Sequence, residues 1–187
     1  MNDIIDNVRA QYSKHPFPSV SRAGDYKIYG KFLRELFESH GKPLEGIDVL
    51  DAGCGTGVMI TDTASQVPEA NFKGIDLTPS SLEIAKSQIT EKNLTNVQVS
   101  EDNLLDMKLK GTFDYAYTWG VIHHTSDPEQ SFKNIASKVK EGGFFMAGVY
   151  GYYGNWERRL QQELMDTCVP NKLQFDEKID AIRDWID

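Results

Sequence analysis

Residues 47–57 read IDVLDAGCGTG, and this stretch decides which fold the chain can adopt. Its first four residues form a short, mainly apolar run that predicts a buried strand. A second apolar run follows the three glycines and predicts a helix over residues 58–67. A tight turn from strand to helix needs residues without Cβ if backbone N–H groups are to approach a ligand closely. Residues 51–57 therefore predict a ligand-binding turn.

Short apolar runs and helical segments keep alternating after this turn. Further strands are expected over residues 71–75, 97–99, 113–118 and 144–150. This alternation predicts an α/β fold, in which a doubly wound, mainly parallel sheet is covered by helices on both faces. The last of these strands is uncharged and rich in β-forming residues, so we expect it to be buried on both faces.

Two of the connecting helices carry clear start signals. Thr78 and Asp127 are suitable N-cap residues, and each is followed by a proline, which fits the first turn of a helix. The first of these helices is expected to extend to about Ile89. The second is expected to end at the glycines of residues 142–143 and to carry three apolar residues at helical spacing: Phe132, Ile135 and Val139.

Two amphipathic helices are expected before the sheet, over residues 3–12 and 26–38. Pro16 and Pro18 lie between them and cannot continue a helix, so this connection is expected to bend. Because these helices precede the sheet without belonging to it, residues 1–45 are interpreted as a lid over the ligand-binding core.

The core is expected to span residues 46–150, followed by a helical segment over residues 151–187. No sixth or seventh strand is visible in that last segment. Its apolar residues instead have helical spacing and predict two helices, one carrying Trp156, Leu160 and Leu164 and one carrying Phe175, Ile179, Ile182 and Ile186.

Length, charge and cysteine content exclude several classes of function. A chain of 187 residues fits one domain, and a net charge of −8 repels nucleic-acid phosphates. No apolar run approaches the roughly 20 residues that cross a bilayer, so no membrane association is expected. The two cysteines, Cys54 and Cys168, have neither a disulfide framework nor zinc-ligand spacing. We therefore expect a cytoplasmic protein without a metal site.

Acidic residues follow the first three predicted strands. Asp51 precedes the glycines, whose spacing is GxGxG rather than the GxGxxG of dinucleotide-binding loops. A carboxylate there would repel a pyrophosphate but accept from an ammonium group, so the ligand is expected to join a nucleoside to an amino acid. Asp76 is placed to accept from both ribose hydroxyls, and Asp102, beside Asn103, from an adenine amino group. Asp102 by itself is equally well explained as a turn former.

Four segments together resemble the class I S-adenosylmethionine-dependent methyltransferases. They are VLDAGCGTG (49–57), GIDLTPSSLEIAK (74–86), SEDNLLDM (100–107) and FDYAYTWGVIHHTSDPEQSFKNIASKVKEGG (113–143). The resemblance covers about residues 46–150 and points to the broad group that acts on small molecules. It implies a Rossmann-like fold, S-adenosylmethionine as the cofactor and a small-molecule methyl acceptor.

The resemblance also implies which residues hold the cofactor. Asp51 and the turn residues Gly53, Cys54, Gly55, Thr56 and Gly57 would surround the methionine portion. Asp76, with the adjacent Leu77, would bind the ribose. Asp102 and Asn103 would read the adenine, and Trp119 would lie near the adenine or the sulfonium.

The family closes its sheet with an antiparallel strand pair after the fifth strand. The helical spacing of residues 151–187 leaves no room for such a pair, so we expect the pair to be missing and the chain to be a truncated fragment.

His123 and His124 admit two interpretations. One of them could act as a general base on the acceptor, because histidine titrates near neutral pH. Alternatively, both shape the loop that leads to the Asp127 cap. We favour the second interpretation, since methyl transfer often needs only in-line positioning of an acceptor that is already nucleophilic.

Several alternatives remain open. Aromatic residues outside the glycine turn could line an acceptor pocket, although such residues more often belong to a core or an interface: Tyr12, Phe17, Tyr150, Tyr152, Tyr153 and Trp156. A non-catalytic module that binds S-adenosylmethionine or S-adenosylhomocysteine would carry the same motifs. A nicotinamide-dependent oxidoreductase is a poorer fit, and a homodimer is left open.

Overall fold

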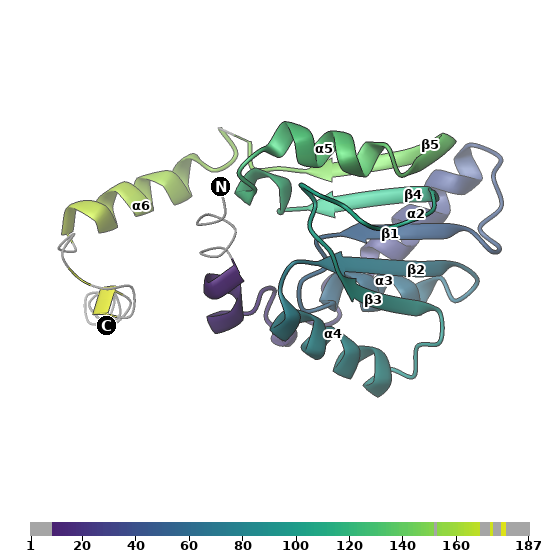
Figure 1. The fold of residues 1–187 in the computed structure, drawn as a ribbon, viewed down its shortest axis with the longest axis horizontal. Coiled ribbons are helices and arrows are strands. Elements are labelled where there is room, and N and C mark those ends of the chain that lie inside the picture. The colour runs from purple at the N-terminus through teal and green to yellow at the C-terminus, as the bar shows by residue number, and fades with distance from the viewer. Residues whose placement is uncertain (1–8, 152, 169–172, 174–176, 179–187) are drawn as a thin grey trace. The chain divides into compact units, whose positions relative to one another are not determined.

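Five strands form a parallel sheet in a computed structural model of the chain, in the order β3-β2-β1-β4-β5 (Figure 1). The strands are β1 (Asp48–Ala52), β2 (Asn71–Asp76), β3 (Val97–Glu101), β4 (Phe113–Trp119) and β5 (Val139–Gly148). The structure describes residues 9–151, 153–168, 173 and 177–178. The strand order changes direction between β1 and β4, and open α/β sheets bind ligands outside the carboxyl ends of strands at such a switch point.

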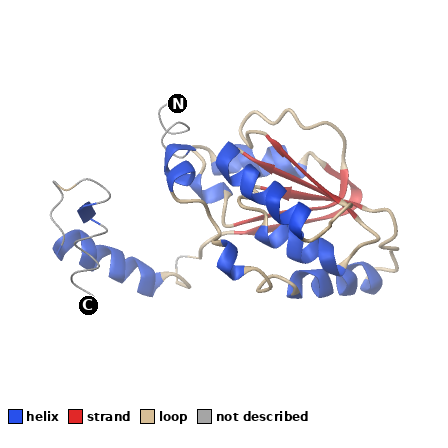
Figure 2. Ribbon diagram, turned by 90° about the horizontal axis from the view of Figure 1, so that it is seen from below, coloured by secondary structure: helices blue, strands red, loops and turns tan. Residues whose placement is uncertain are grey.

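Helices cover both faces of this sheet (Figure 2). Residues 9–14 are helical, and the other helices of the unit are η1 (Val20–Arg22), α2 (Ile28–Ser39), α3 (Val58–Gln66), α4 (Pro79–Glu91), η2 (Ile122–His124) and α5 (Pro128–Ala136). Val49 and Leu50 of β1 point to opposite faces because side chains alternate along a strand. Val49 packs in a core with residues of α2, α3 and α4, whereas Leu50 packs with Ile135 of α5.

The first four strands and the helices between them agree with the sequence predictions to within two residues. The helix predicted from Asp127 to beyond Val139 is wrong at its C-terminal end, because α5 ends at Ala136 and β5 begins at Val139. Val139 pairs with Phe113, and the strand pairing then shifts register before Phe144 pairs with Tyr115. The apolar spacing of Val139 therefore served a strand at a β-bulge rather than a helix.

The burial expected for the fifth strand is also wrong. Every residue of β5 is at least partly exposed, and the strand ends at Gly148 rather than at Tyr150. β5 lies at the edge of the described sheet, where it pairs with β4. All strand pairs among the described residues are parallel.

Residues 150–187 form a second compact unit, and residues 1–149 form the first. The described part of the second unit contains α6 (Trp156–Cys168), which confirms the first of the two helices predicted there. Its apolar residues Trp156, Leu160 and Leu164 are exposed. The second predicted helix, around residues 175–186, lies outside the described residues apart from residues 177–178. No helix in the described parts of the chain is both long and apolar enough to cross a membrane.

Candidate functional site

The three glycines of the turn after β1 each sit where a side chain would collide with a different neighbour. Their φ angles are all positive, at 98° for Gly53, 53° for Gly55 and 80° for Gly57. A Cβ on Gly53 would come within 2.6 Å of Val121, and one on Gly57 within 2.7 Å of Ala85 on α4. The turn therefore depends on glycine for both its backbone conformation and its packing.

Gly55 packs against the N-terminal segment. A Cβ there would collide with the backbone carbonyl of Phe17, which belongs to the N-terminal segment. The backbone N–H of Gly55 donates to Oδ2 of Asp76 at 2.9 Å, which ties the turn to the end of β2. The turn is therefore in direct contact with the N-terminal segment at Gly55.

Asp51 lies at the centre of the site, at the carboxyl end of β1, with 3% of its surface exposed. The hydroxyl of Tyr117 donates to its Oδ2 at 2.9 Å. Burial raises the pKa of Asp51 to about 7; the Tyr117 hydrogen bond opposes this rise, and the nearby Asp76 adds to it. A group in the site that carried positive charge would strongly favour the ionised carboxylate.

Asp76 ends β2 and is also mostly buried, which raises its pKa. Its Oδ2 accepts from Gly55, and its Oδ1 accepts from the backbone N–H of Thr78 at 2.8 Å. Each oxygen keeps a further lone pair with which it can accept from a ligand hydroxyl.

Asp102 holds the loop that follows β3. Its Oδ1 accepts from the backbone N–H of Asn103 at 2.8 Å, and its Oδ2 from that of Leu109 at 2.8 Å. The N–H of Lys108 lies within hydrogen-bond distance of both oxygens. This geometry supports the turn-forming explanation of Asp102, although the residue also lines the pocket described next.

A single pocket brings most of the predicted site residues together at the carboxyl ends of the strands. It is lined by nine of the predicted cofactor-binding residues: Asp51, Gly53, Cys54, Gly55, Asp76, Leu77, Asp102, Asn103 and Trp119. Thr56 and Gly57 do not line it. Thr56 is buried and donates from its Oγ1 to the carbonyl of Pro18 at 2.6 Å. We refer to this pocket as the crevice.

Several residues that line the crevice are aromatic. Trp119 is the last residue of β4, is 48% exposed, and contacts Tyr29 edge to face with ring centroids 5.7 Å apart. Tyr12, Phe17 and Tyr26 of the N-terminal segment also line the crevice. Of the other aromatic candidates, Tyr150, Tyr153 and Trp156 belong to the second unit, and Tyr152 lies outside the described residues.

The two candidate histidines occupy different places. His124 lines the crevice, whereas His123 does not. Their rings lie 4.1 Å apart on η2, and burial lowers the pKa of both. Both are therefore neutral at pH 7, and His124 is the one whose position permits contact with a ligand.

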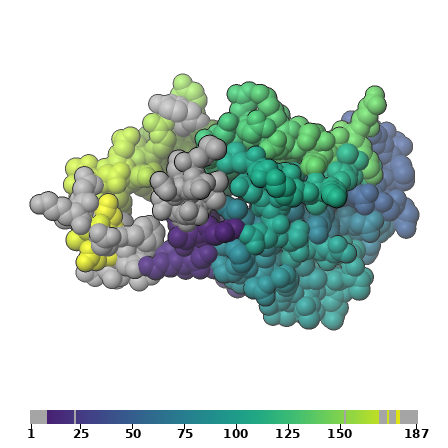
Figure 3. All heavy atoms as spheres, viewed as in Figure 1, coloured from purple at the N-terminus to yellow at the C-terminus, as the bar shows by residue number. Residues whose placement is uncertain are grey.

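The N-terminal segment, residues 9–27, is attached to the sheet layer by individual polar contacts. In Figure 3 the purple atoms at the start of the described chain lie against the teal atoms of the sheet layer. Arg9 donates from Nε to the carbonyl of Leu77 at 3.2 Å and forms an ion pair with Glu101. These contacts hold the segment beside the ends of β2 and β3, and Thr56 holds it against the glycine turn.

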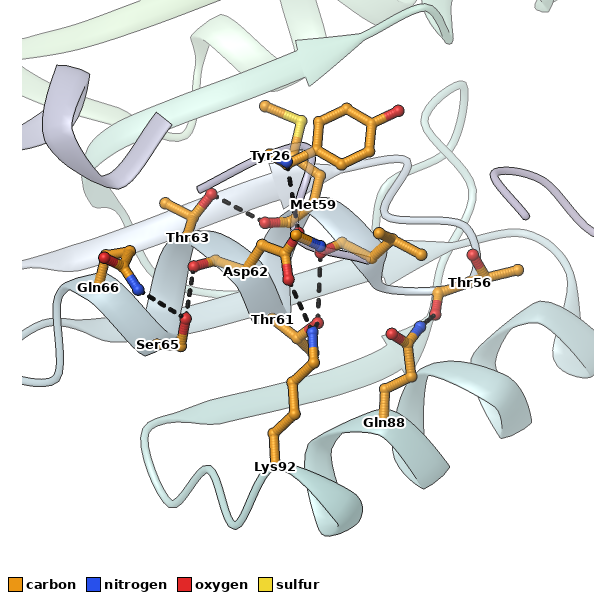
Figure 4. Close-up of polar contacts among 12 residues, drawn as sticks. Tyr26, Thr56, Met59, Thr61, Asp62, Thr63, Ser65, Gln66, Gln88 and Lys92 are labelled. Carbon is orange, nitrogen blue, oxygen red and sulfur yellow. Dashed lines mark hydrogen bonds and ion pairs between the residues drawn. The ribbon is translucent and has the colours of Figure 1, made fainter. Parts of the chain in front are cut away.

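A buried carboxylate anchors the same segment to α3. Figure 4 shows Asp62 between the backbone of Tyr26 and the ammonium group of Lys92. Asp62 is 2% exposed, and its Oδ2 accepts from the N–H groups of Gly24 at 2.5 Å and Tyr26 at 3.4 Å. Lys92 donates to its Oδ1 at 2.8 Å. This role of Asp62 is not recognisable from the sequence, because a lone Asp in an apolar helix gives no signal of its partners.

The crevice has an unusual charge balance. Asp51, Asp76 and Asp102 line it, but no Lys or Arg is found among the described residues of its lining. No group of three or more His, Cys, Asp or Glu side chains in the described structure is arranged to hold a metal ion. The crevice is therefore suited to a ligand that itself carries positive charge.

The fold is an open α/β sheet with a crevice at the carboxyl ends of its strands, and comparison with known proteins gives the family. Residues 43–185 match the methyltransferase domain family, and the chain belongs to that family. This confirms the resemblance that the motifs indicated.

Two relatives and one solved structure illustrate the range of similarity. An uncharacterized protein of Synechococcus sp. is 34% identical over 174 residues, covering 87% of this chain and 41% of the relative. A ubiquinone biosynthesis O-methyltransferase of Albidiferax ferrireducens is 32% identical over 114 residues, covering 60% of this chain and 44% of the enzyme. The structure of PKMT2 from Rickettsia typhi in complex with AdoHcy superposes with a TM-score of 0.64 at 24% identity, covering 79% of this chain and 30% of that one. The chain thus spans less than half the length of each.

Proposed function

We propose that this domain binds S-adenosylmethionine and transfers its methyl group to a small-molecule acceptor. The observation that carries the proposal is the crevice with the buried carboxylates of Asp51 and Asp76 and no Lys or Arg among its described lining residues. S-adenosylmethionine has two cationic groups, an ammonium and a sulfonium, and its ribose offers two hydroxyl donors. A pyrophosphate would be repelled by the same carboxylates, which argues against a nicotinamide dinucleotide.

In this proposal the chain's residues orient the cofactor from its two ends. Asp51 accepts from the ammonium group, and Asp76 accepts from the ribose hydroxyls while its backbone bonds to Gly55 and Thr78 hold it still. The loop that Asp102 shapes borders the adenine, with Asp102 and Asn103 as the proposed adenine contacts. When bound, the cofactor supplies an activated methyl group.

The acceptor is proposed to enter on the aromatic side, between Trp119 and the N-terminal segment. Tyr12, Phe17 and Tyr26 would exclude water there and fix the acceptor in line with the methyl group. His124 is the candidate proton acceptor on this side, with shaping of the loop as the alternative role. His123 is assigned to the loop.

Two of the similar proteins described above support the proposal. One carries the name of a ubiquinone biosynthesis O-methyltransferase, and one was solved with AdoHcy, the demethylated product of S-adenosylmethionine. The free thiols Cys54 and Cys168 fit the cytoplasmic location that we propose. Exclusion of nucleic acid, and the possibility of a homodimer, remain predictions.

Isothermal titration tests the ligand assignment. The protein should bind S-adenosylmethionine and S-adenosylhomocysteine and should not bind NAD under the same conditions. Preferential binding of NAD would overturn the proposal. Turnover with a panel of small-molecule acceptors then distinguishes an enzyme from a module that binds the cofactor without catalysis.

A further inference from the structure

Tyr117 places a hydroxyl group beside Asp51 at the floor of the crevice. The side chain comes from the middle of β4, is fully buried in the core, and donates to Oδ2 of Asp51 at 2.9 Å. No other described residue donates a side-chain hydrogen bond to Asp51, so its Oδ1 is left for a ligand. The sequence motifs did not indicate this contact.

The groups around Asp51 determine how strongly this hydrogen bond affects the charge of its carboxyl group. The titratable groups that shift the pKa of Asp51 are Tyr117 from β4 and Asp76 from β2. Asp51 in turn raises the pKa of Tyr115 on β4 and of Cys54 in the glycine turn. Lys73 of β2 acts on Cys54 but does not line the crevice, and the neutral His124 lines it from η2. Burial and Asp76 both oppose ionisation of Asp51, whereas Tyr117 favours it.

We propose that Tyr117 is a positioning residue for the cofactor, whose hydroxyl keeps the Asp51 carboxylate ionised and turned so that Oδ1 meets the ligand's ammonium group. The inference rests on the proposed function, because it takes the ligand to be an amino acid joined to a nucleoside. It adds a residue that acts through Asp51 and makes cofactor affinity dependent on pH.

Tyr115 provides a matched control on the same strand. It lies two residues before Tyr117 on the same face, with the two rings 5.6 Å apart, and is also buried. Its hydroxyl contacts Sδ of Met146 at 3.6 Å rather than Asp51. Tyr115→Phe therefore removes a buried hydroxyl without touching the proposed ligand contact.

The test compares the S-adenosylhomocysteine affinity of Tyr117→Phe, Tyr115→Phe and the unchanged protein by calorimetry. Tyr117→Phe should weaken binding by about tenfold at pH 7, the range for loss of one charge-assisted hydrogen bond. The loss should shrink as the pH rises, because Asp51 then ionises without the hydroxyl's help. The ratio of the two affinities cancels titration of the ligand's own amino group. Tyr115→Phe should bind as the unchanged protein does.

Two further measurements distinguish a positioning role of Tyr117 from a merely structural one. One uses a second ligand, and the other combines Tyr117→Phe with a substitution of Asp51. Affinity for 5′-methylthioadenosine, which lacks the amino-acid portion, should be equal in Tyr117→Phe and the unchanged protein. In an Asp51→Asn background, Tyr117→Phe should add no further loss. Equal loss for both ligands, or a loss independent of pH, would refute the role of Tyr117. Failure of the unchanged protein to bind either ligand would instead refute the proposed function.

Discussion

The crevice and the N-terminal segment belong to the same unit but are held in place by different forces. Asp51 and Tyr117 at the crevice floor lie within the sheet, surrounded by the apolar core. Residues 9–27 are fastened by separate hydrogen bonds that involve Thr56, Asp62 and Leu77, and by the ion pair between Arg9 and Glu101. Burial of a core is cooperative, whereas single polar contacts each contribute little. The floor of the crevice should therefore persist when the segment is loosened, and the effects of substitutions in the two regions should differ in size.

The largest expected effect concerns Asp51 and pH. Burial raises its folded pKa from the usual 3.8 to about 7, so the unliganded protein binds a proton there that the unfolded chain releases. This contribution to stability is complete below about pH 4 and is lost as the pH rises through about 7. Over that range it amounts to about 4 kcal/mol. Chemical unfolding of the unchanged protein and of Asp51→Asn should show that the variant lacks this pH-dependent part; parallel profiles would contradict it.

The next effect is on ligand binding at the end of β2. Asp76→Ala removes the proposed ribose contacts and should weaken binding of S-adenosylhomocysteine by about 1.5–3 kcal/mol. Asp106→Ala is the control, because it removes the same charge from an exposed ion pair with Lys108. Calorimetry should show an unchanged affinity for the control. An unchanged affinity in Asp76→Ala would mean that the crevice is not the ligand site.

A substitution of Gly55 tests the contact between the glycine turn and the N-terminal segment. Gly55→Ala should cost about 1–3 kcal/mol of stability, from its positive φ and from the collision with the Phe17 carbonyl. Gly46→Ala has a similar φ of 71° but no neighbour near its Cβ, so it measures the backbone strain alone. Hydrogen exchange of residues 9–24 should accelerate in Gly55→Ala only. Equal exchange in the two variants would show that Phe17 does not depend on this contact.

A substitution of Asp62 tests how the N-terminal segment is attached to α3, without changing the glycine turn. Asp62→Asn should lower stability by about 1 kcal/mol, because the amide keeps an acceptor for Gly24 but loses the ion pair with Lys92. Lys86→Ala breaks an exposed pair with Glu83 and should leave the stability nearly unchanged. Amide exchange should accelerate at residues 24–26 and stay the same in β1. Faster exchange in β1 would mean that the segment supports the sheet.

The smallest effect is expected without any substitution. If residues 1–45 act as a lid, residues 9–24 should gain protection from hydrogen exchange when S-adenosylhomocysteine binds. The exchange of α5, on the opposite face, serves as the internal reference. Identical exchange of residues 9–24 with and without the ligand would identify them as a static wall.

Much of the fold could be predicted because its signals are local. Short apolar runs predicted four strands, and proline after Thr78 and Asp127 predicted two helix starts. The end of α5 was missed because Val139 continues the helical spacing while its pairing partner, Phe113, lies 26 positions earlier. Exposure of β5 was missed because the position of a strand at a sheet edge is set by the whole topology.

The candidate site likewise contains some residues that can be predicted from the sequence and others that cannot. The glycine turn and the aspartates at strand ends are recognisable from residue type and spacing. Tyr117 resembles any aromatic residue in a buried strand, and its role appears only when β4 is paired beside β1. Asp62 was missed for a similar reason, since its partners are backbone amides 36 and 38 positions away.

The bulge in β5 also limits how the sheet can grow. The pairing between β4 and β5 is regular from Phe144 to Gly148 and irregular before Phe144. A regular ladder needs an unbroken run of extended residues, so a strand added along the outer side of β5 would find five suitable residues there. If an added strand paired with these five residues one position out of register, each of its side chains would point to the opposite face of the sheet. The bulge therefore restricts both the length and the alignment of any neighbour that β5 accepts.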